Sequence, residues 1–380
     1  MARKRIIYQS EALYAGATGD TSPGQLHRVQ DVSHNVEVAR QDVNEFGKLA
    51  ALSREIIEPP TVGLDFTYYP VDGFNEASGL GFTVQGITTD APTSAVSGIM
   101  AQDSTEAEKN YYILTVPEGE DASKGSAYNA TDRAAQGVIG IGNGYLTSYT
   151  VDASVGDIPS VSCSVEASNL RFDTSGSGFQ NPAVSVSDGS AMPGTVEVPL
   201  STTGELSAAA LRPGDVSITF GSASLQMGGA ILPGMTSAAT DNSSGANVQN
   251  FSIDLPLSRT PLQRIGNIFP FSRELDFPIT ATLSVTANLT NLDAGTVRDL
   301  LCNEATQRDI TVTMNNRCGT TVADNSMVFT FKNAQLDSQN MSSSIGDNKS
   351  VDLSFSAQIG GPTDTTNGVF ISGTSGSWNP

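Results

Sequence analysis

The chain contains two imperfect copies of one segment, and this repeat restricts the folds that it can adopt. Residues 29–66 align without a gap on residues 248–285, a shift of 219, and eleven of the 38 positions are identical. Unrelated segments of this composition would share about two or three. Apolar residues recur at every second position in both copies, as Val32, Val36 and Val38 do in the first. This period is typical of a strand with one buried face, so each copy predicts strand, connection, strand.

A second pair of segments repeats further along the chain. Residues 144–168 align on residues 334–358 at a shift of 190, with nine of 25 positions identical. Both copies predict a strand, a Gly-Asp turn and a second strand, which is the signature of a β-hairpin. Between the two repeated blocks, residues 111–116 resemble residues 309–314 in pattern, at a shift of about 198.

The repeats predict a tandem duplication of one β domain. We expect four parts: a first domain over 1–172, a Ser/Gly/Pro-rich linker over 173–214 with one strand at 195–200, a second domain over 215–360, and a C-terminal extended arm over 361–380. One flanking helix is expected, with Asp293 near its N-terminus and Val297, Leu300 and Leu301 at helical spacing.

The composition of the chain argues against several classes of function. The 380 residues include 20 Lys and Arg against 40 Asp and Glu, a net charge of −20, and 37 glycines. This balance suits a β protein with many turns, and argues against binding to nucleic acid or to an anionic membrane surface. No stretch is apolar enough for a membrane span, and residues 1–10 do not resemble a secretory signal. Three cysteines, Cys163, Cys302 and Cys318, form no disulfide framework, so we expect folding in a reducing compartment.

Residues for catalysis or metal binding are scarce. The two histidines are His34, expected as a half-buried structural residue of a strand, and His27, expected in solvent. Residues 137–144, GVIGIGNG, lack the spacing of a dinucleotide fingerprint and are expected to form a glycine-rich turn. We find no nucleophile elbow, no zinc-binding helix and no calcium loop. We therefore expect no enzyme activity, no cofactor and no resident metal.

The most suggestive polar residues repeat with the strands. The triplet Ser-Arg-Glu occurs at residues 53–55 and again at residues 272–274, and an arginine precedes each one at the same distance. Two interpretations remain open: ion pairing between subunits of a symmetric assembly, or an internal salt bridge that fixes each connection. The candidate contact residues are Arg40, Arg54, Glu55, Arg259, Arg273 and Glu274.

Two blocks of the sequence resemble the major tail proteins that form the tubes of long-tailed phages. The blocks are residues 29–69 and residues 144–168, and within the second the stretch Gly144–Pro159, GYLTSYTVDASVGDIP, is most similar to that family. The resemblance covers most of residues 1–172 and, more faintly, 215–360.

The resemblance implies two tandem β-sandwich or barrel tail-tube domains, each with a flanking helix, in a virion protein assembled in the host cytoplasm. Members of the family place about six domains around a ring, and one hairpin of each lines an inner β-barrel. A duplicated chain would then close the ring as a trimer with pseudo-sixfold symmetry. The implied partners are further copies of the chain, a tape measure protein, and terminator and baseplate proteins. DNA would pass through the acidic lumen without specific binding.

Other classes of protein share some of these features. Another tail or baseplate subunit of the same fold would have the same strands. A tandem β-sandwich surface adhesin fits the low charge and the Ser/Thr content, but not the start of the chain. A polysaccharide-degrading enzyme needs two carboxylates at one site, and the spacing of the acidic residues suggests no such pair.

Overall fold

The computed structural model describes residues 7, 11–86, 107–116, 122, 137–174, 179–198, 216–220, 246–289, 308–315, 325–346 and 348–373. In this part of the chain the protein is mainly β, as expected, and most strands belong to one large antiparallel sheet.

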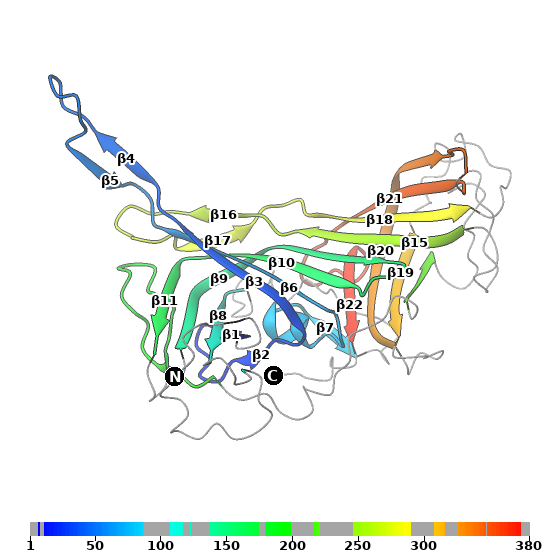
Figure 1. Cartoon of the computed structure of the whole chain (residues 1–380), viewed down its shortest axis with the longest axis horizontal. Helices are drawn as coiled ribbons and strands as arrows, with labels where there is room; N and C mark the ends of the chain where they lie inside the picture. Colours follow the sequence, from blue (N-terminus) through cyan, green and yellow to red (C-terminus); the bar gives the residue numbers. More distant parts are fainter. Residues whose placement is uncertain are drawn as a thin grey trace.

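One long sheet runs through both repeats without a break (Figure 1). The first repeat contributes, from the outer edge inward, β3 (Val29–Glu37), β6 (Thr61–Tyr68), β10 (Ser160–Ala167) and β9 (Gly137–Ser154). The second continues with β15 (Ala246–Pro256), β18 (Thr280–Leu289), β21 (Ser350–Gln358) and β20 (Asn325–Ser342). The two repeats therefore share one sheet, which is joined where β15 pairs with β9.

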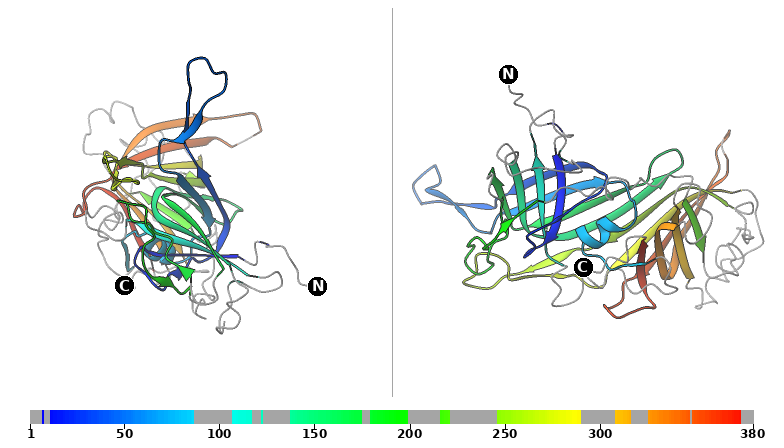
Figure 2. Two further views of the ribbon diagram at one scale, coloured as in Figure 1. Left: turned by 90° about the vertical axis from the view of Figure 1, so that its left-hand side faces the viewer. Right: turned by 90° about the horizontal axis from the view of Figure 1, so that it is seen from below.

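The N-terminal halves of β9 and β20 leave the long sheet and form a second set of strands beneath it (Figures 1 and 2). Beside β9 lie β8 (Lys109–Thr115), β1 (Glu11–Ala17), β2 (Gly24–Gln25) and β11 (Asn169–Asp173). Beside β20 lie β19 (Arg308–Asn315), β14 (Val216–Phe220), β22 (Gly368–Gly373) and, next to β22, β7 (Val84–Gly86).

The two repeats share details of backbone geometry. The β3–β6 pair has a register shift between Val29 and Asp31, and the β15–β18 pair has one between Val248 and Asn250, which are the residues 219 positions later. The αL glycines Gly47 and Gly266 differ by 219, and Gly156 and Gly346 differ by 190. In one place the expected alignment is wrong by a residue. The β8–β9 and β19–β20 registers equate Tyr111 with Ile310, a shift of 199, because strand pairing rather than local pattern fixes the register.

Alternation along each strand divides the long sheet into an apolar and a polar face. In β6, Val62, Leu64, Phe66 and Tyr68 are buried, while Asp65 points to the opposite face and is exposed. Successive side chains of a strand point to opposite faces, so a period of two buries one face only. The apolar face packs against the second set of strands, and together they form one core that extends through both repeats.

The flanking helices expected for the two domains are not seen in the described residues. The described residues contain one helical element, the five-residue π-helix η2 (Asn75–Gly79), and show no flanking helix. The helix expected over Asp293–Leu301 lies outside the described residues.

The expected arm and linker both contain segments that pack into the core. Residues 368–373 form β22, which is buried along its length, with Val369, Phe370 and Ile371 at its centre, and it pairs with β20 and β7. Within the expected linker, β12 (Phe179–Gln180) pairs with β13 (Thr195–Val196). The side chains of Phe179 and Val196 join a second core with residues of β1 and β8. The strand expected over 195–200 is thus short.

The glycine-rich stretch 137–144 is not a turn but the first half of strand β9. Its glycines are needed for close packing. A Cβ atom at Gly142 would lie 2.3 Å from the carbonyl oxygen of Pro182, and one at Gly140 would lie 2.9 Å from the Pro182 ring. These residues therefore allow the segment after β12 to lie directly on the strand.

A buried carboxylic acid lies in the core of the first repeat. Oε1 of Glu76, in η2, accepts hydrogen bonds from the hydroxyls of Tyr68 at 2.6 Å and Tyr149 at 3.1 Å. Burial raises the pKa of Glu76 above its ordinary value, and the tyrosine hydrogen bonds offset only part of this effect. Beside η2, His27 is buried and stacks on Phe74, contrary to the expectation of a solvated histidine.

Glu76→Gln should change how stability depends on pH. A raised pKa means that the folded protein holds a proton that the unfolded chain releases above pH 4.5, so the free energy of unfolding falls as the pH rises through this window. Glutamine does not titrate, so this fall in the free energy of unfolding is absent from the variant. We expect the melting temperature of the variant to exceed that of the parent by a margin that grows above pH 4.5. Exposed Glu55→Gln is the matched control, and an equal pH dependence in all three proteins would contradict the assignment.

Candidate assembly interface

The junction between the two repeats is an antiparallel seam between β15 and β9. Its register places Ile253 opposite Val151 and Leu255 opposite Tyr149. All four side chains are buried, on the apolar face of the sheet. The hydroxyl of Thr150 donates to Oδ1 of Asp254 at 3.0 Å on the polar face. The second repeat is thus joined to the first by pairing β15 with β9.

The corresponding strand of the first repeat, β3, is the end of the strand path, and none of the described strands pairs with its outer edge. Leu255 is 1% exposed, whereas its equivalent in β3, Val36, is 46% exposed. His34, the equivalent of Ile253, is also exposed, which corrects the expectation that it is half-buried. Each lies opposite a buried residue of β6, so these side chains are on the apolar face of an edge strand. An exposed edge with apolar residues is a template for pairing with another strand.

The complementary edge is on β20. The second half of β9 has β10 on one side and β15 on the other. The second half of β20 pairs with β21 in the way that β9 pairs with β10, including the same register shift. In the described part of the chain, no strand occupies the β20 side that corresponds to β15. The structure therefore ends in two edges, β3 and β20, that match the two sides of the internal seam.

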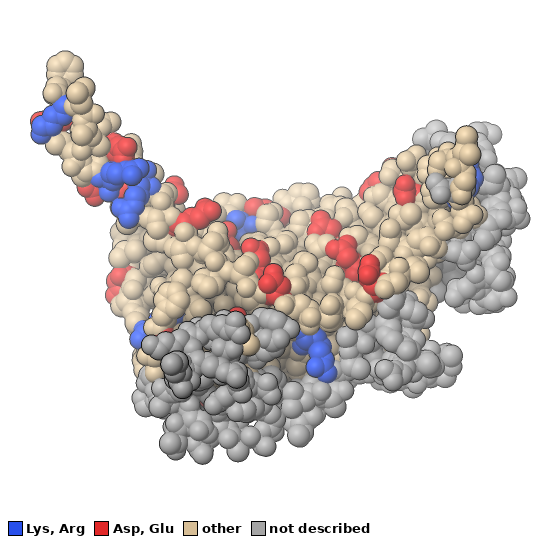
Figure 3. All heavy atoms as spheres, in the orientation of Figure 1, with Lys and Arg blue, Asp and Glu red and all other residues tan. Residues whose placement is uncertain are grey.

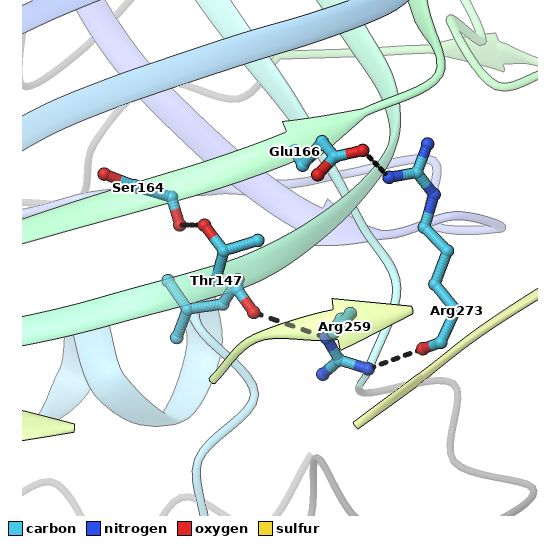
Figure 4. A network of polar contacts seen from close by, with 6 residues as sticks. Thr147, Ser164, Glu166, Arg259 and Arg273 are labelled. Atoms are coloured by element: carbon cyan, nitrogen blue, oxygen red, sulfur yellow. Dashed lines mark hydrogen bonds and ion pairs between the residues drawn. The ribbon is translucent and has the colours of Figure 1, made fainter. Parts of the chain in front are cut away.

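The connection between β15 and β18 forms a hairpin of β16 (Arg259–Leu262) and β17 (Ser272–Leu275), which is docked on the first repeat. The guanidinium groups of Arg259 and Arg273 lie over the ring of Tyr145, 5.2 and 5.9 Å from its centroid. Nε of Arg259 donates to the Leu146 carbonyl at 3.3 Å, and Arg273 forms an ion pair with Glu166 (Figure 4).

These contacts remove Arg259 from solvent. Desolvation lowers its pKa to about 10, which leaves it charged at neutral pH, and the nearby Glu274 opposes the shift. Nη1 of Arg259 also donates to the Arg273 carbonyl at 2.9 Å, so both strands of the hairpin are held. Glu274 itself accepts a hydrogen bond from the Ser272 hydroxyl at 2.5 Å.

The equivalent hairpin of the first repeat, β4 (Arg40–Val43) and β5 (Ser53–Ile56), projects away from the body of the protein (Figure 1). Nε of Arg54 pairs with Oδ1 of Asp42 at 2.7 Å, within the hairpin. The Arg54 side chain is 68% exposed, against 7% for its counterpart Arg273. Arg40 and Glu55 are exposed.

The predicted residues therefore separate into two groups. Arg259 and Arg273 meet at one site between the repeats, whereas Arg54 forms an internal salt bridge. Sequence reasoning missed the partners Tyr145, Glu166 and Asp42. A signal was present, because these are positions where the copies differ: their equivalents are Gln335, Ser356 and Pro261.

Carboxylates collect on the polar face of the long sheet. In the strands that form this sheet, the described residues of the polar face include no Lys or Arg, and its acidic residues are Asp31, Glu37, Asp65, Asp152, Glu166, Asp254, Asp337 and Asp352. Figure 3 shows acidic side chains spread along this sheet. The polar face therefore repels polyanions.

The described residues offer little to a metal or a membrane. They contain no cluster of three or more His, Cys, Asp or Glu side chains that could hold a metal ion. None of the described helical segments is long and apolar enough to cross a membrane. A hollow of about 970 Å³ lies at the seam on the polar face, lined by residues such as Tyr69, Asp152 and Ser252.

No protein-family model matches the chain, and no curated protein is significantly similar to it. The case for a function therefore depends on the repeats, the seam and the two open edges.

Arg273→Met and Arg54→Met form a matched pair of variants. Removing Arg273 breaks a largely desolvated contact and leaves Glu166 without its cation, so we expect a loss of about 1–3 kcal/mol in the free energy of unfolding. Removing Arg54 breaks an exposed ion pair, with an expected change below about 1 kcal/mol. Chemical denaturation of the two monomeric variants measures both changes, and equal losses would contradict the difference in burial.

Proposed function

We propose that the chain is a structural subunit of a phage tail tube, in which copies close into rings by pairing β3 of one copy with β20 of the next. The observation that supports this most strongly is the internal seam, which shows how the same two strand types pair when both are present. The two open edges are the two sides of that seam, one at each end of the eight-strand path from β3 to β20.

The internal seam also gives the register of the proposed contact. Shifting the β15 residues by 219 and the β9 residues by 190 places Ser33 opposite Ser342, His34 opposite Met341, and Asn35 opposite Asn340. His34 and Met341 would occupy the apolar face, as Ile253 and Val151 do. A contact of this kind is heterologous, since different surfaces meet, and it forms a ring when the rotation closes.

The number of copies is taken from the tail-protein resemblance, which implies six domains in a ring. Three copies of this two-repeat chain would supply them, and their eight strands each would form a closed barrel of about 24 strands. At about 4.8 Å between strands, the barrel would be on the order of 40 Å across, wide enough for a DNA duplex. Closure would also remove both exposed strand edges.

The acidic face suits the lumen of such a barrel. The apolar face of the long sheet is covered by the second set of strands, which leaves the polar face for the inside of the ring. The described strands of this wall carry carboxylates and no Lys or Arg, and Arg273 of the docked hairpin is already paired with Glu166. Such a wall would not bind the phosphates of DNA, because binding depends on neutralisation by cations. This is the property that a conduit needs.

Stacking of rings into a tube has candidate surfaces at both ends of the barrel. Three apolar side chains of each hairpin are exposed in both repeats: Val43, Phe46 and Leu52 in the first, and Leu262, Ile265 and Phe271 in the second. At the opposite end of the strands, the turns after β9 and β20 expose Val155, Ile158 and Ile345. In the proposed virion, the end rings would meet the terminator and baseplate proteins, and the lumen would hold the tape measure protein.

Val36→Asp tests the proposed seam. A carboxylate on the apolar face would have to be buried when β3 pairs, so we expect rings to be lost. The melting temperature of the monomer should stay unchanged, because Val36 is exposed there. Native mass spectrometry and negative-stain microscopy give the oligomeric state. Phe172→Asp, at an exposed apolar residue outside the seam, is the control and should assemble like the parent. Normal assembly of Val36→Asp would rule out the β3 contact.

His34→Ile should have the opposite effect. The substitution copies Ile253 of the internal seam, which packs opposite Val151, and it replaces a polar ring by an apolar side chain at the proposed contact. We expect the protein concentration at half-assembly to fall by roughly tenfold at neutral pH, which corresponds to about 1.4 kcal/mol. Light scattering across a dilution series measures this midpoint. A midpoint equal to or higher than that of the parent would count against burial of residue 34.

A further inference from the structure

The two hairpins have the same local fold but different surroundings, and the difference identifies a second contact surface. Both have the same strand register, which pairs Arg40 with Ile56 and Arg259 with Leu275. Only β16–β17 lies on another repeat. The positions of a hairpin that become covered on docking can therefore be read by comparing the two copies.

The comparison divides each hairpin into two faces. Residues exposed in both copies, such as Phe46 and Ile265, remain outside the contact. Other positions differ strongly. Arg54 is 68% exposed, whereas its equivalent Arg273 is 7% exposed. Ile56 is 52% exposed, whereas its equivalent Leu275 packs against the core. We call Arg40, Arg54 and Ile56 the docking face of β4–β5.

We infer that the docking face of β4–β5 binds the second repeat of the neighbouring copy, over the start of the long-sheet half of β20. This inference rests on the proposed ring. If β3 pairs with β20 as β15 pairs with β9, the hairpin that follows β3 is carried to the place on β20 that β16–β17 occupies on β9.

The chemistry of that place fits the hairpin. The carbonyl that accepts from Arg259 belongs to Leu146, and its equivalent is the carbonyl of Leu336. The next residue is Asp337, an exposed carboxylate where the first repeat has Thr147. Oδ1 of Asp337 accepts a hydrogen bond from the Ser356 hydroxyl at 2.9 Å, and Ser356 stands where the first repeat has Glu166. The first repeat has the carboxylate of this site on β10, whereas the second repeat has it on β20, and there it would face Arg40.

The two hairpins differ at the residue opposite their arginine, and the surfaces that would receive them differ in the matching way. Arg273 has proline, Pro261, opposite it in the hairpin and finds its carboxylate, Glu166, on the first repeat. Arg54 has Asp42 opposite it and would meet Ser356. Each arginine therefore has one carboxylate partner in its own setting. This matching favours the second repeat, rather than the first, as the surface that receives β4–β5.

A charge exchange between copies tests the contact. Arg40→Glu places a carboxylate near Asp337, and Asp337→Lys places an amine near Arg40. We expect each variant to raise the concentration at half-assembly into rings by roughly tenfold to a hundredfold. The double variant should return to within about threefold of the parent, because it restores an opposite-charge pair. Both residues are exposed in the monomer, and the hydrogen bond that Asp337 accepts from Ser356 is exposed too, so the monomer melting temperatures should stay close to that of the parent.

Lys48→Glu, at the tip of the same hairpin, is the matched control and should assemble into rings like the parent. Parent-like assembly of Arg40→Glu, or a double variant as weak as the weaker single variant, would overturn the contact while leaving the rings in place. If the parent itself forms no rings, the proposed function fails and the contact fails with it.

Discussion

The pairing of β15 with β9 is the interaction on which the rest of the structure depends. A strand edge has backbone donors and acceptors that need partners, and the second repeat supplies them to the first. This pairing makes one sheet out of two repeats, buries Ile253 and Leu255, and brings the β16–β17 hairpin onto Tyr145. It also leaves one edge of β3 and one edge of β20 without a partner among the described strands, because a chain with two repeats contains one seam between them.

The internal seam and the proposed seam between copies differ in the polarity of the side chains that they pair. The internal seam places aliphatic and aromatic side chains opposite each other, as in Leu255 with Tyr149. The proposed seam between copies would place His34 opposite Met341 and Asn35 opposite Asn340. A more polar edge allows a subunit to remain soluble until it meets another copy, whereas the internal seam forms once, during folding. The same division is seen in the hairpins, where Arg273 is buried in its ion pair and Arg54 is exposed in its own.

Much of the fold could be predicted from the repeats, because period two fixes which side chains face the core, and identical spacing fixes which strands correspond. Buried Val62, Leu64 and Phe66 follow from this pattern alone. The register of β8 and β19 was wrong by one residue, since short apolar segments match equally well at neighbouring shifts. Strand β22 and the buried residues around Phe179 were missed because Gly- and Ser-rich sequences resemble linkers, and only tertiary contacts show that Phe179 and Phe370 are buried. In the candidate site, the arginines were found from their repetition. Their partners Glu166 and Asp42 were not, since each occurs in one copy only.

Cryo-electron microscopy of assembled protein would test ring closure most directly. The map should show threefold rings in which β3 of each copy pairs antiparallel with β20 of the next, with Asn35 opposite Asn340 and the carboxylates of the long sheet facing the lumen. Monomers, rings without threefold closure, or rings in which β3 stays unpaired would contradict this arrangement.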